Sequence, residues 1–77
     1  MDFDVRRRLK WIDGREERGL AHDEPFQGDP ILEALGETPD LANYIDQAIH
    51  DGRMPEQVGR ELIRKVRDVD GVISLYR

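Results

Sequence analysis

Apolar side chains recur with helical spacing in the second half of the chain. Two segments each carry one apolar stripe, with neighbours three or four residues apart, as on one face of an α-helix. We expect the two helices to pack on each other across the short loop 50–54. The stripes are formed by Leu41, Ile45, Ala48 and Ile49 in the first segment and by Val58, Leu62, Val66 and Val69 in the second.

Prolines and glycines divide the region from residue 29 to residue 71 into three predicted helices. Proline is favoured in the first turn of a helix, where its missing N–H costs nothing, and glycine is common just after the end. The first helix is predicted to begin at Asp29-Pro30 and stop at Gly36. The second begins at Thr38-Pro39, with Thr38 as its cap, and ends at Gly52; the third begins at Pro55 and ends near Gly71.

The N-terminal segment allows two interpretations. As a helix it has a stripe of Val5, Leu9 and Ile12, a cap at Asp2 or Asp4, and an end at Gly14. As a strand, its apolar residues alternate with charged ones from residue 2 to residue 11, with one break at residue 7. The arginine-rich run favours the helix by intrinsic propensity.

Two further segments complete the predicted fold. Residues 14–28 contain four punctuating Gly or Pro residues and are expected to form a long loop with at most one helical turn. Residues 72–76 (VISLY) are rich in strand formers and need a partner strand or a surface on which to dock. The fold class expected is mainly α: one domain, residues 1–77, forming a small bundle of three to four short helices with a 14–28 loop and a short C-terminal extended or β segment.

The chain has 77 residues and no cysteine, which excludes disulfides and thiolate metal sites. A core of this size contributes only about 3–5 kcal/mol of net stability. We therefore expect association with a protein partner, and a homo-oligomer is an open alternative. The N-terminus lacks the apolar run of a signal peptide, and no window approaches the roughly 20 apolar residues of a membrane span. These features predict a cytoplasmic protein without membrane contact.

The sequence offers little material for catalysis or cofactor binding. Asp46 and His50 lie one helical turn apart, but they supply two ligands where a zinc site needs three or four. Ser74 has no histidine near it in sequence, and the glycines do not form a phosphate-binding loop. We predict a non-enzymatic protein with no catalytic residues, no metal site and no cofactor.

Acidic charge is concentrated in the middle of the chain. Residues 19–52 hold eight acids and no Lys or Arg, whereas residues 1–18 and 53–77 each hold six basic residues; the net charge of the whole chain is −5. The acids either pair in space with the basic ends or present a negative face to a basic partner. Asp29 and Asp40 are assigned to the first turns of helices. The predicted partner-binding face is therefore Glu33, Glu37, Asp46 and Asp51, with Phe26 as a hydrophobic anchor.

Basic residues form two clusters that could contact nucleic acid. Arg60, Arg64 and Arg67 form a stripe on the last predicted helix, and with the preceding helix they resemble a helix-turn-helix in outline. Glu56 at the start of that helix opposes this, and Glu56–Arg60, Glu61–Lys65 and Arg64–Asp68 pairs within the helix are the simpler explanation. Trp11 beside Arg6–Arg8 could stack on bases, but a place at the edge of the core is favoured.

Three functions remain open at this point. The first is a protein-interaction module that regulates or inhibits a larger, basic, nucleic-acid-handling protein, of the kind carried by bacterial viruses and mobile elements. The second is a small dimeric helix-turn-helix-like DNA-binding regulator, although the acidity makes nucleic acid the less favoured partner. The third is a structural subunit of a larger assembly, joined through strand addition by residues 72–76.

Overall fold

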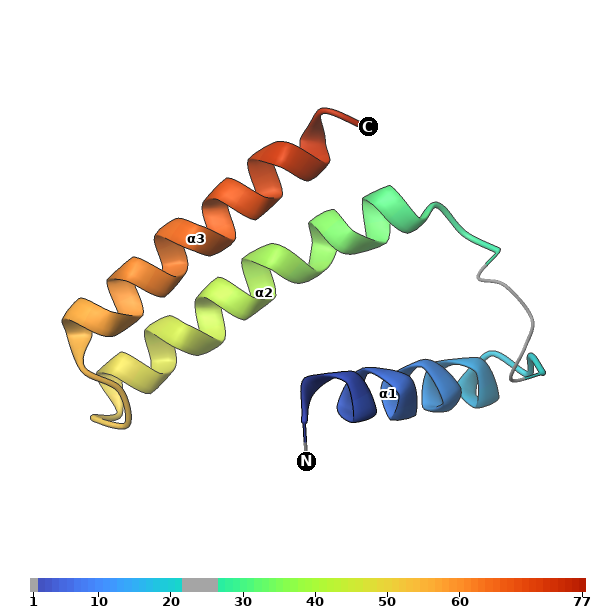
Figure 1. Ribbon diagram of the computed structural model, residues 1–77, viewed down its shortest axis with the longest axis horizontal. Helices are drawn as coiled ribbons and strands as arrows, with labels where there is room; N and C mark the ends of the chain where they lie inside the picture. The colour runs from blue at the N-terminus through green and yellow to red at the C-terminus, as the bar shows by residue number, and fades with distance from the viewer. Residues whose placement is uncertain (1, 22–26) are drawn as a thin grey trace.

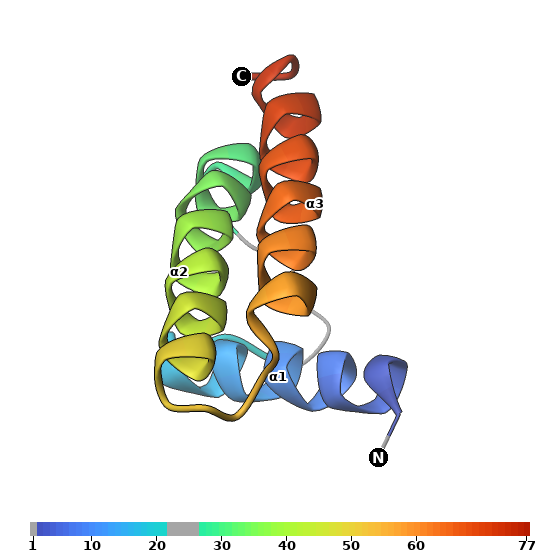
Figure 2. The same ribbon diagram turned by 90° about the vertical axis from the view of Figure 1, so that its left-hand side faces the viewer.

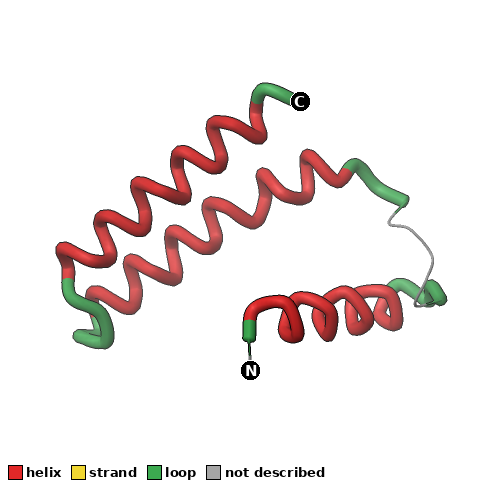
Figure 3. The backbone as a smooth tube through the Cα atoms, in the orientation of Figure 1, coloured by secondary structure: helices red, strands yellow, loops and turns green. Residues whose placement is uncertain are grey.

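The computed structural model describes residues 2–21 and 27–77, which form three α-helices. They are α1 (Phe3–Glu17), α2 (Pro30–His50) and α3 (Glu56–Ser74), shown in Figure 1. None of the described residues lies in a strand, as Figure 3 makes visible. The mainly-α class is confirmed, and the helical interpretation of the N-terminal segment is the correct one.

Helices α2 and α3 lie side by side as an antiparallel hairpin, which both ribbon views show (Figures 1 and 2). The predicted packing of these two helices across the short loop is confirmed, although Leu41, Val58 and Val69 of the predicted stripes stay 50–52% exposed. Most stripe residues become half-buried rather than fully buried, because each is covered from one side only. The half-buried apolar residues of this contact include Ile45, Ala48 and Ile49 of α2 and Leu62, Val66 and Ile73 of α3.

Helix α3 comes into close contact with α2 at Gly59. This residue of α3 is buried, and a Cβ atom built on it would overlap Cγ1 and Cδ1 of Ile49 and lie 3.3 Å from Sδ of Met54. The missing side chain therefore makes room for Ile49 in the helix–helix contact. A small residue at a helix crossing allows the neighbouring backbone to approach, at the cost of reduced helix propensity.

The starts of α1 and α2 follow the predicted caps. The Asp2 carboxylate accepts a hydrogen bond from the Val5 amide at 2.9 Å and caps α1. The Asp29 carboxylate accepts from the amides of Ile31 and Leu32, at 2.9 and 3.3 Å, with Pro30 in the first turn of α2. These bonds satisfy amide donors that have no partner inside the helix.

Two glycines end helices through positive φ angles, and Gly14 is not one of them. Gly19 (φ 71°) follows α1 and Gly52 (φ 74°) follows α2. After each, an amide bonds back across the turn: Leu20 to the Arg15 carbonyl at 2.8 Å, and Arg53 to the Ala48 carbonyl at 2.9 Å. This is the Schellman pattern of helix termination. The prediction for Gly52 is confirmed, whereas the prediction that α1 stops at Gly14 is wrong, and helix replaces the start of the predicted 14–28 loop.

Helix α2 is continuous where two short helices were predicted. Gly36 does not stop it and Pro39 lies inside it, so Thr38 is not a cap. Pro39 cannot donate to the carbonyl of Leu35, but the Thr38 hydroxyl lies 3.4 Å from that oxygen and also contacts the carboxylate of Asp70 on α3. Packing against α3 on both sides of the proline outweighs the lost backbone bond.

Residues 72–74 are helical and residues 75–76 form a turn, which corrects the predicted extended or β segment. Helix α3 continues through Gly71 to Ser74, whose hydroxyl donates to the Asp70 carbonyl at 2.9 Å. The row of α3 residues that faces α2 includes Val66, Asp70 and Ile73, at helical spacing. The contact of α3 with α2 therefore keeps residues 72–74 in a helix, because tertiary packing outweighs the local preference for a strand.

Helix α1 stands apart from the hairpin, so the three helices do not form the predicted bundle. No Cα atom of α1 comes within 8 Å of a Cα atom of α2 or α3. The radius of gyration is 14.9 Å, against about 11–12 Å for a compact domain of this length. Among the described residues no apolar side chain is fully buried.

The close approach at Gly59 predicts that Gly59→Ala destabilises the hairpin. Alanine favours the helix by about 1 kcal/mol relative to glycine. Its Cβ would displace Ile49, however, and overpacking of this kind lowers the free energy of unfolding by about 1–3 kcal/mol. Thermal unfolding followed by circular dichroism should show a lower midpoint. Gly71→Ala is the matched control: its Cβ would meet nothing within 4 Å, so that midpoint should rise. Equal rises in both variants would contradict the close approach.

A continuous α2 predicts that Pro39→Ala stabilises the protein. Alanine supplies the missing amide to the Leu35 carbonyl and removes the proline ring, a change worth about 1–3 kcal/mol in a helix interior. Urea unfolding at one fixed protein concentration measures it. A loss of stability would contradict the single helix, since proline is favoured only where a separate helix begins.

Candidate functional site

The most coherent charged surface is an acidic row along one side of α2. Glu33, Glu37 and Asp40 follow one another at intervals of four and three residues, all exposed, and Tyr44 extends the row with 75% of its surface exposed. We call Glu33, Glu37 and Asp40 the acidic row. Asp40 was assigned to a first turn, but α2 begins at Pro30, so Asp40 lies in the helix middle, away from the positive end of the dipole.

The four acids predicted to form one face do not lie together. Asp46 projects from a different side of α2 than Glu33 and Glu37, and it pairs with Arg60 of α3 at 2.9 Å. Asp51 follows the end of the helix, and its carboxylate accepts a hydrogen bond from the side-chain amide of Gln47 at 2.8 Å. Phe26, the predicted anchor, is outside the described residues. Tyr44 is the exposed aromatic residue that lies beside the acids.

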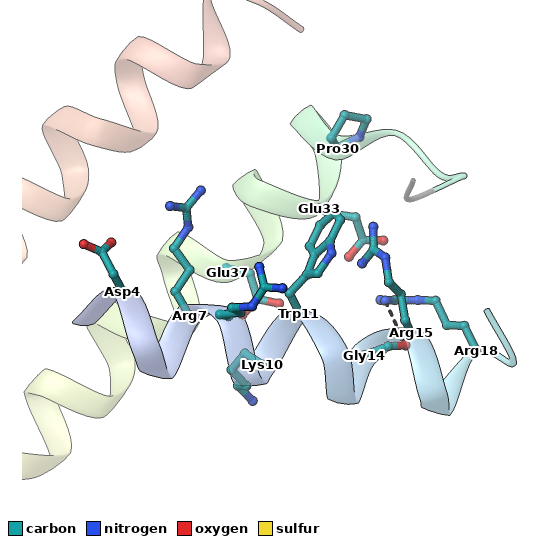
Figure 4. Close-up of a pocket in the computed structure, with 11 residues that line it drawn as sticks. Asp4, Arg7, Lys10, Trp11, Gly14, Arg15, Arg18, Pro30, Glu33 and Glu37 are labelled. Atoms are coloured by element: carbon teal, nitrogen blue, oxygen red, sulfur yellow. Dashed lines mark hydrogen bonds between the residues drawn. The ribbon is translucent and has the colours of Figure 1, made fainter. Parts of the chain in front are cut away.

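A cleft of about 820 Å³ separates α1 from the first half of α2 (Figure 4). Glu33, Glu37 and Pro30 line it from α2. In Figure 4, Trp11 and Arg15 rise from α1 toward the turn that bears Glu33. Opposite charges therefore face each other across the cleft. Its basic lining residues are Arg7, Arg8, Lys10, Arg15 and Arg18.

Trp11 is covered by an arginine and not by a hydrophobic core. The guanidinium carbon of Arg15 lies 2.9 Å from the centre of the indole ring, a cation–π arrangement. Arg15 is buried, whereas Trp11 stays 49% exposed. The interpretation of Trp11 as a residue at the edge of the core is wrong, because α1 packs on no other described helix.

The basic stripe on α3 is largely engaged in ion pairs. Arg60 pairs with Asp46 and, at 3.9 Å, with Glu56, as the spacing predicts. Arg64 pairs with Glu61, three residues before it, in place of the predicted Asp68. The basic ends of the chain thus compensate part of the acidic middle. The side-by-side hairpin also differs from a helix-turn-helix, whose helices cross at about 90–120°.

The Glu61–Arg64 pair shifts the pKa of both side chains. The hydrogen bond from the Arg64 guanidinium is the main cause that holds the pKa of Glu61 below its usual value, and it raises the pKa of Arg64. Because the folded-state pKa of Glu61 is lowered, the pair stabilises the fold at neutral pH and loses this contribution as pH falls through that pKa. Both side chains are exposed, so solvent and salt screen the effect.

Metal-ligand side chains do not cluster in the described part of the chain. No three His, Asp or Glu side chains there gather as metal ligands would. Asp46 and His50 are both exposed, and Asp46 is engaged by Arg60. Likewise, none of the described helices has the length and apolar character needed to cross a membrane.

Comparisons of the chain with protein-family models, with curated proteins and with solved structures find no match. What the chain does therefore has to be inferred from its exposed surfaces and charges.

The ion pair on α3 predicts that Arg64→Gln raises the pKa of Glu61 toward that of a free glutamate. The hydrogen-bonded cation that favours the carboxylate is then absent. An NMR titration of the Glu61 side-chain carboxyl carbon reports the value directly. Arg67→Gln removes the same charge from the same helix without touching the pair and should leave Glu61 unchanged. A Glu61 pKa that responds equally to both variants would contradict a specific contact.

Proposed function

We propose that this chain is a non-enzymatic, acidic protein-interaction module that regulates or inhibits a larger, basic, nucleic-acid-handling protein. The observation that supports it is the acidic row of α2 with Tyr44 at its end. Carboxylates repeat about every turn, some 5–6 Å apart, which resembles the linear negative charge that a phosphate-binding groove accepts. Helix α2 carries four acids and no Lys or Arg, so its field is not cancelled along its own length.

Charge and an aromatic anchor have separate roles in such an interface. The negative field of α2 steers a basic surface into place and penalises acidic partners, which raises association rates and sets specificity. Affinity comes mainly from a few well-packed residues, among which tyrosine is enriched. Tyr44 follows Asp40 by one helical turn, and its large exposed surface is available to fill a pocket on the partner.

The cleft suggests where the partner makes first contact. The basic residues of α1 lie opposite Glu33 and Glu37, whereas Asp40 and Tyr44 do not line the cleft. A basic partner would therefore engage Asp40 and Tyr44 first. It would then compete with the arginines of α1 for the upstream half of the acidic row. Helix α1 thus acts as an internal stand-in for the basic partner.

The alternatives have less support. A DNA complex through α3 would have to break the Arg60 and Arg64 pairs and bring the acids of α2 toward phosphates. Strand addition by residues 72–76 would first require unwinding the end of α3, which is helical to Ser74. A protein partner with a basic groove makes use of the charges as they are placed.

The test is capture of a partner from host extract by the immobilised chain. The double variant Glu37→Gln plus Asp40→Asn should lose the partner or release it at much lower salt, because two of the three steering charges are gone. The matched control is Asp46→Asn plus Glu56→Gln, which removes two acids from the Arg60 cluster and leaves the acidic row intact. That control should retain the partner.

The recovered protein should be basic and should bind nucleic acid in competition with this chain. Equal loss of binding in both double variants would mean that net charge alone, and not the acidic row, holds the partner. A stoichiometric partner that is acidic, or that survives neutralisation of the row, would overturn the proposal.

A further inference from the structure

The hairpin has two unlike flanks, one polar and one apolar. The Arg60–Asp46 ion pair marks the polar flank of both helices. Successive residues of a helix are rotated by about 100°, so the residues just before and just after a contact residue lie on opposite flanks. On α3, Val58 and Arg60 stand on either side of the buried Gly59. Val58 therefore lies on the flank opposite the ion pair.

The residues just before other contact residues form the rest of the apolar flank. On α2, Asp46 follows the half-buried Ile45, and Leu41 precedes the half-buried Ala42. Val69 and Val72 likewise precede the contact residues Asp70 and Ile73 of α3. We call this surface the apolar face: Leu41, Val58, Val69 and Val72, each 50–58% exposed although the hairpin is formed. Lys65, four residues before Val69, lies among them as an exposed cation.

The exposed area is larger than a stable monomer of this mass has. The chain exposes 6534 Å², whereas a compact protein of 9.0 kDa exposes about 4,900 Å². The excess over that figure is about 1,600 Å², and a standard interface buries about 800 Å² on each partner. One interface of standard size would remove about half of this excess, to which the separation of α1 from the hairpin also contributes.

We propose that the apolar face binds a second copy of this chain, so that two hairpins form a four-helix bundle. A two-fold axis along the hairpins would place α2 of one copy against α3 of the other. Pairing α2 with α2 would oppose two helices with four acids and no Lys or Arg each, whereas α3 carries four acids and four basic residues. Charge therefore favours the α2–α3 pairing.

This inference does not depend on the proposed function. The acidic row lies further round α2 than Leu41, at the outer edge of the apolar face, so a dimer leaves it accessible. Each dimer would present two acidic rows. Helix α1, with its own stripe of Val5 and Leu9, does not cover the apolar face in this structure.

Sedimentation equilibrium of the full chain tests the dimer, because it reports mass independently of the elongated shape. The expected result is twice the 9.0 kDa chain mass. Val69→Glu should raise the dissociation constant by about ten-fold or more, since each copy would bury a carboxylate whose desolvation is repaid only in part by Lys65, one helical turn before it. Gln57→Glu adds the same charge to an exposed position of α3 away from the apolar face and should leave the mass doubled.

A second measurement covers the case in which Val69→Glu fails to fold. The thermal midpoint of the unaltered chain should rise with protein concentration, as it does when folding and dimerisation are coupled. A folded monomer with a concentration-independent midpoint would overturn the proposal. A dimer that persists in folded Val69→Glu, or a trimer or larger species, would overturn it as well. None of these outcomes bears on capture of a basic partner through the acidic row.

Discussion

The contact between Gly59 and Ile49 is the interaction on which the rest of the structure depends. It allows close contact between α2 and α3 near the loop, and the hydrogen bond between Thr38 and Asp70 joins them farther from the loop. That packing carries α2 through Gly36 and Pro39, and it keeps the C-terminal strand formers in a helix. Each of these segments would terminate or extend by local propensity alone. The hairpin is thus held by tertiary contact over local signals that oppose it.

Local chemistry made several elements predictable from the sequence. Asp2, Asp29 and Gly52 act through bonds to residues within a few positions, so their roles can be read without knowing the fold. The apolar stripes likewise define which side of α2 meets α3. Local sequence does not distinguish Gly36 from Gly52. Both are glycines after an apolar run, but of the two only Gly52 adopts positive φ and ends a helix. Nothing near Gly36 in the sequence announces that α3 will pack beside it.

The composition of the acidic surface likewise depends on the continuity of α2. Splitting α2 into two helices placed Asp40 in a first turn and removed it from the acidic face. A continuous helix restores a single register from residue 30 to residue 50, and that register groups Asp40 and Tyr44 with Glu33 and Glu37 while it sends Asp46 toward Arg60. The position of Pro39 inside α2 therefore decides which acids belong to the surface. Charge composition predicted that acids would matter, but only the register decides which ones act together.

The absence of a buried apolar side chain among the described residues links stability to function. A hairpin with one apolar flank gains less from burial than a closed core, while the entropy of ordering its residues is the same. Such a chain is stable when a second surface completes it, and the cost of ordering is then paid on association. If two copies pair through the apolar face as proposed, the concentration of the chain sets how much of it is folded. The acidic row would then be displayed in its helical register only where the chain accumulates, and abundance would control how much of it is available to a basic partner.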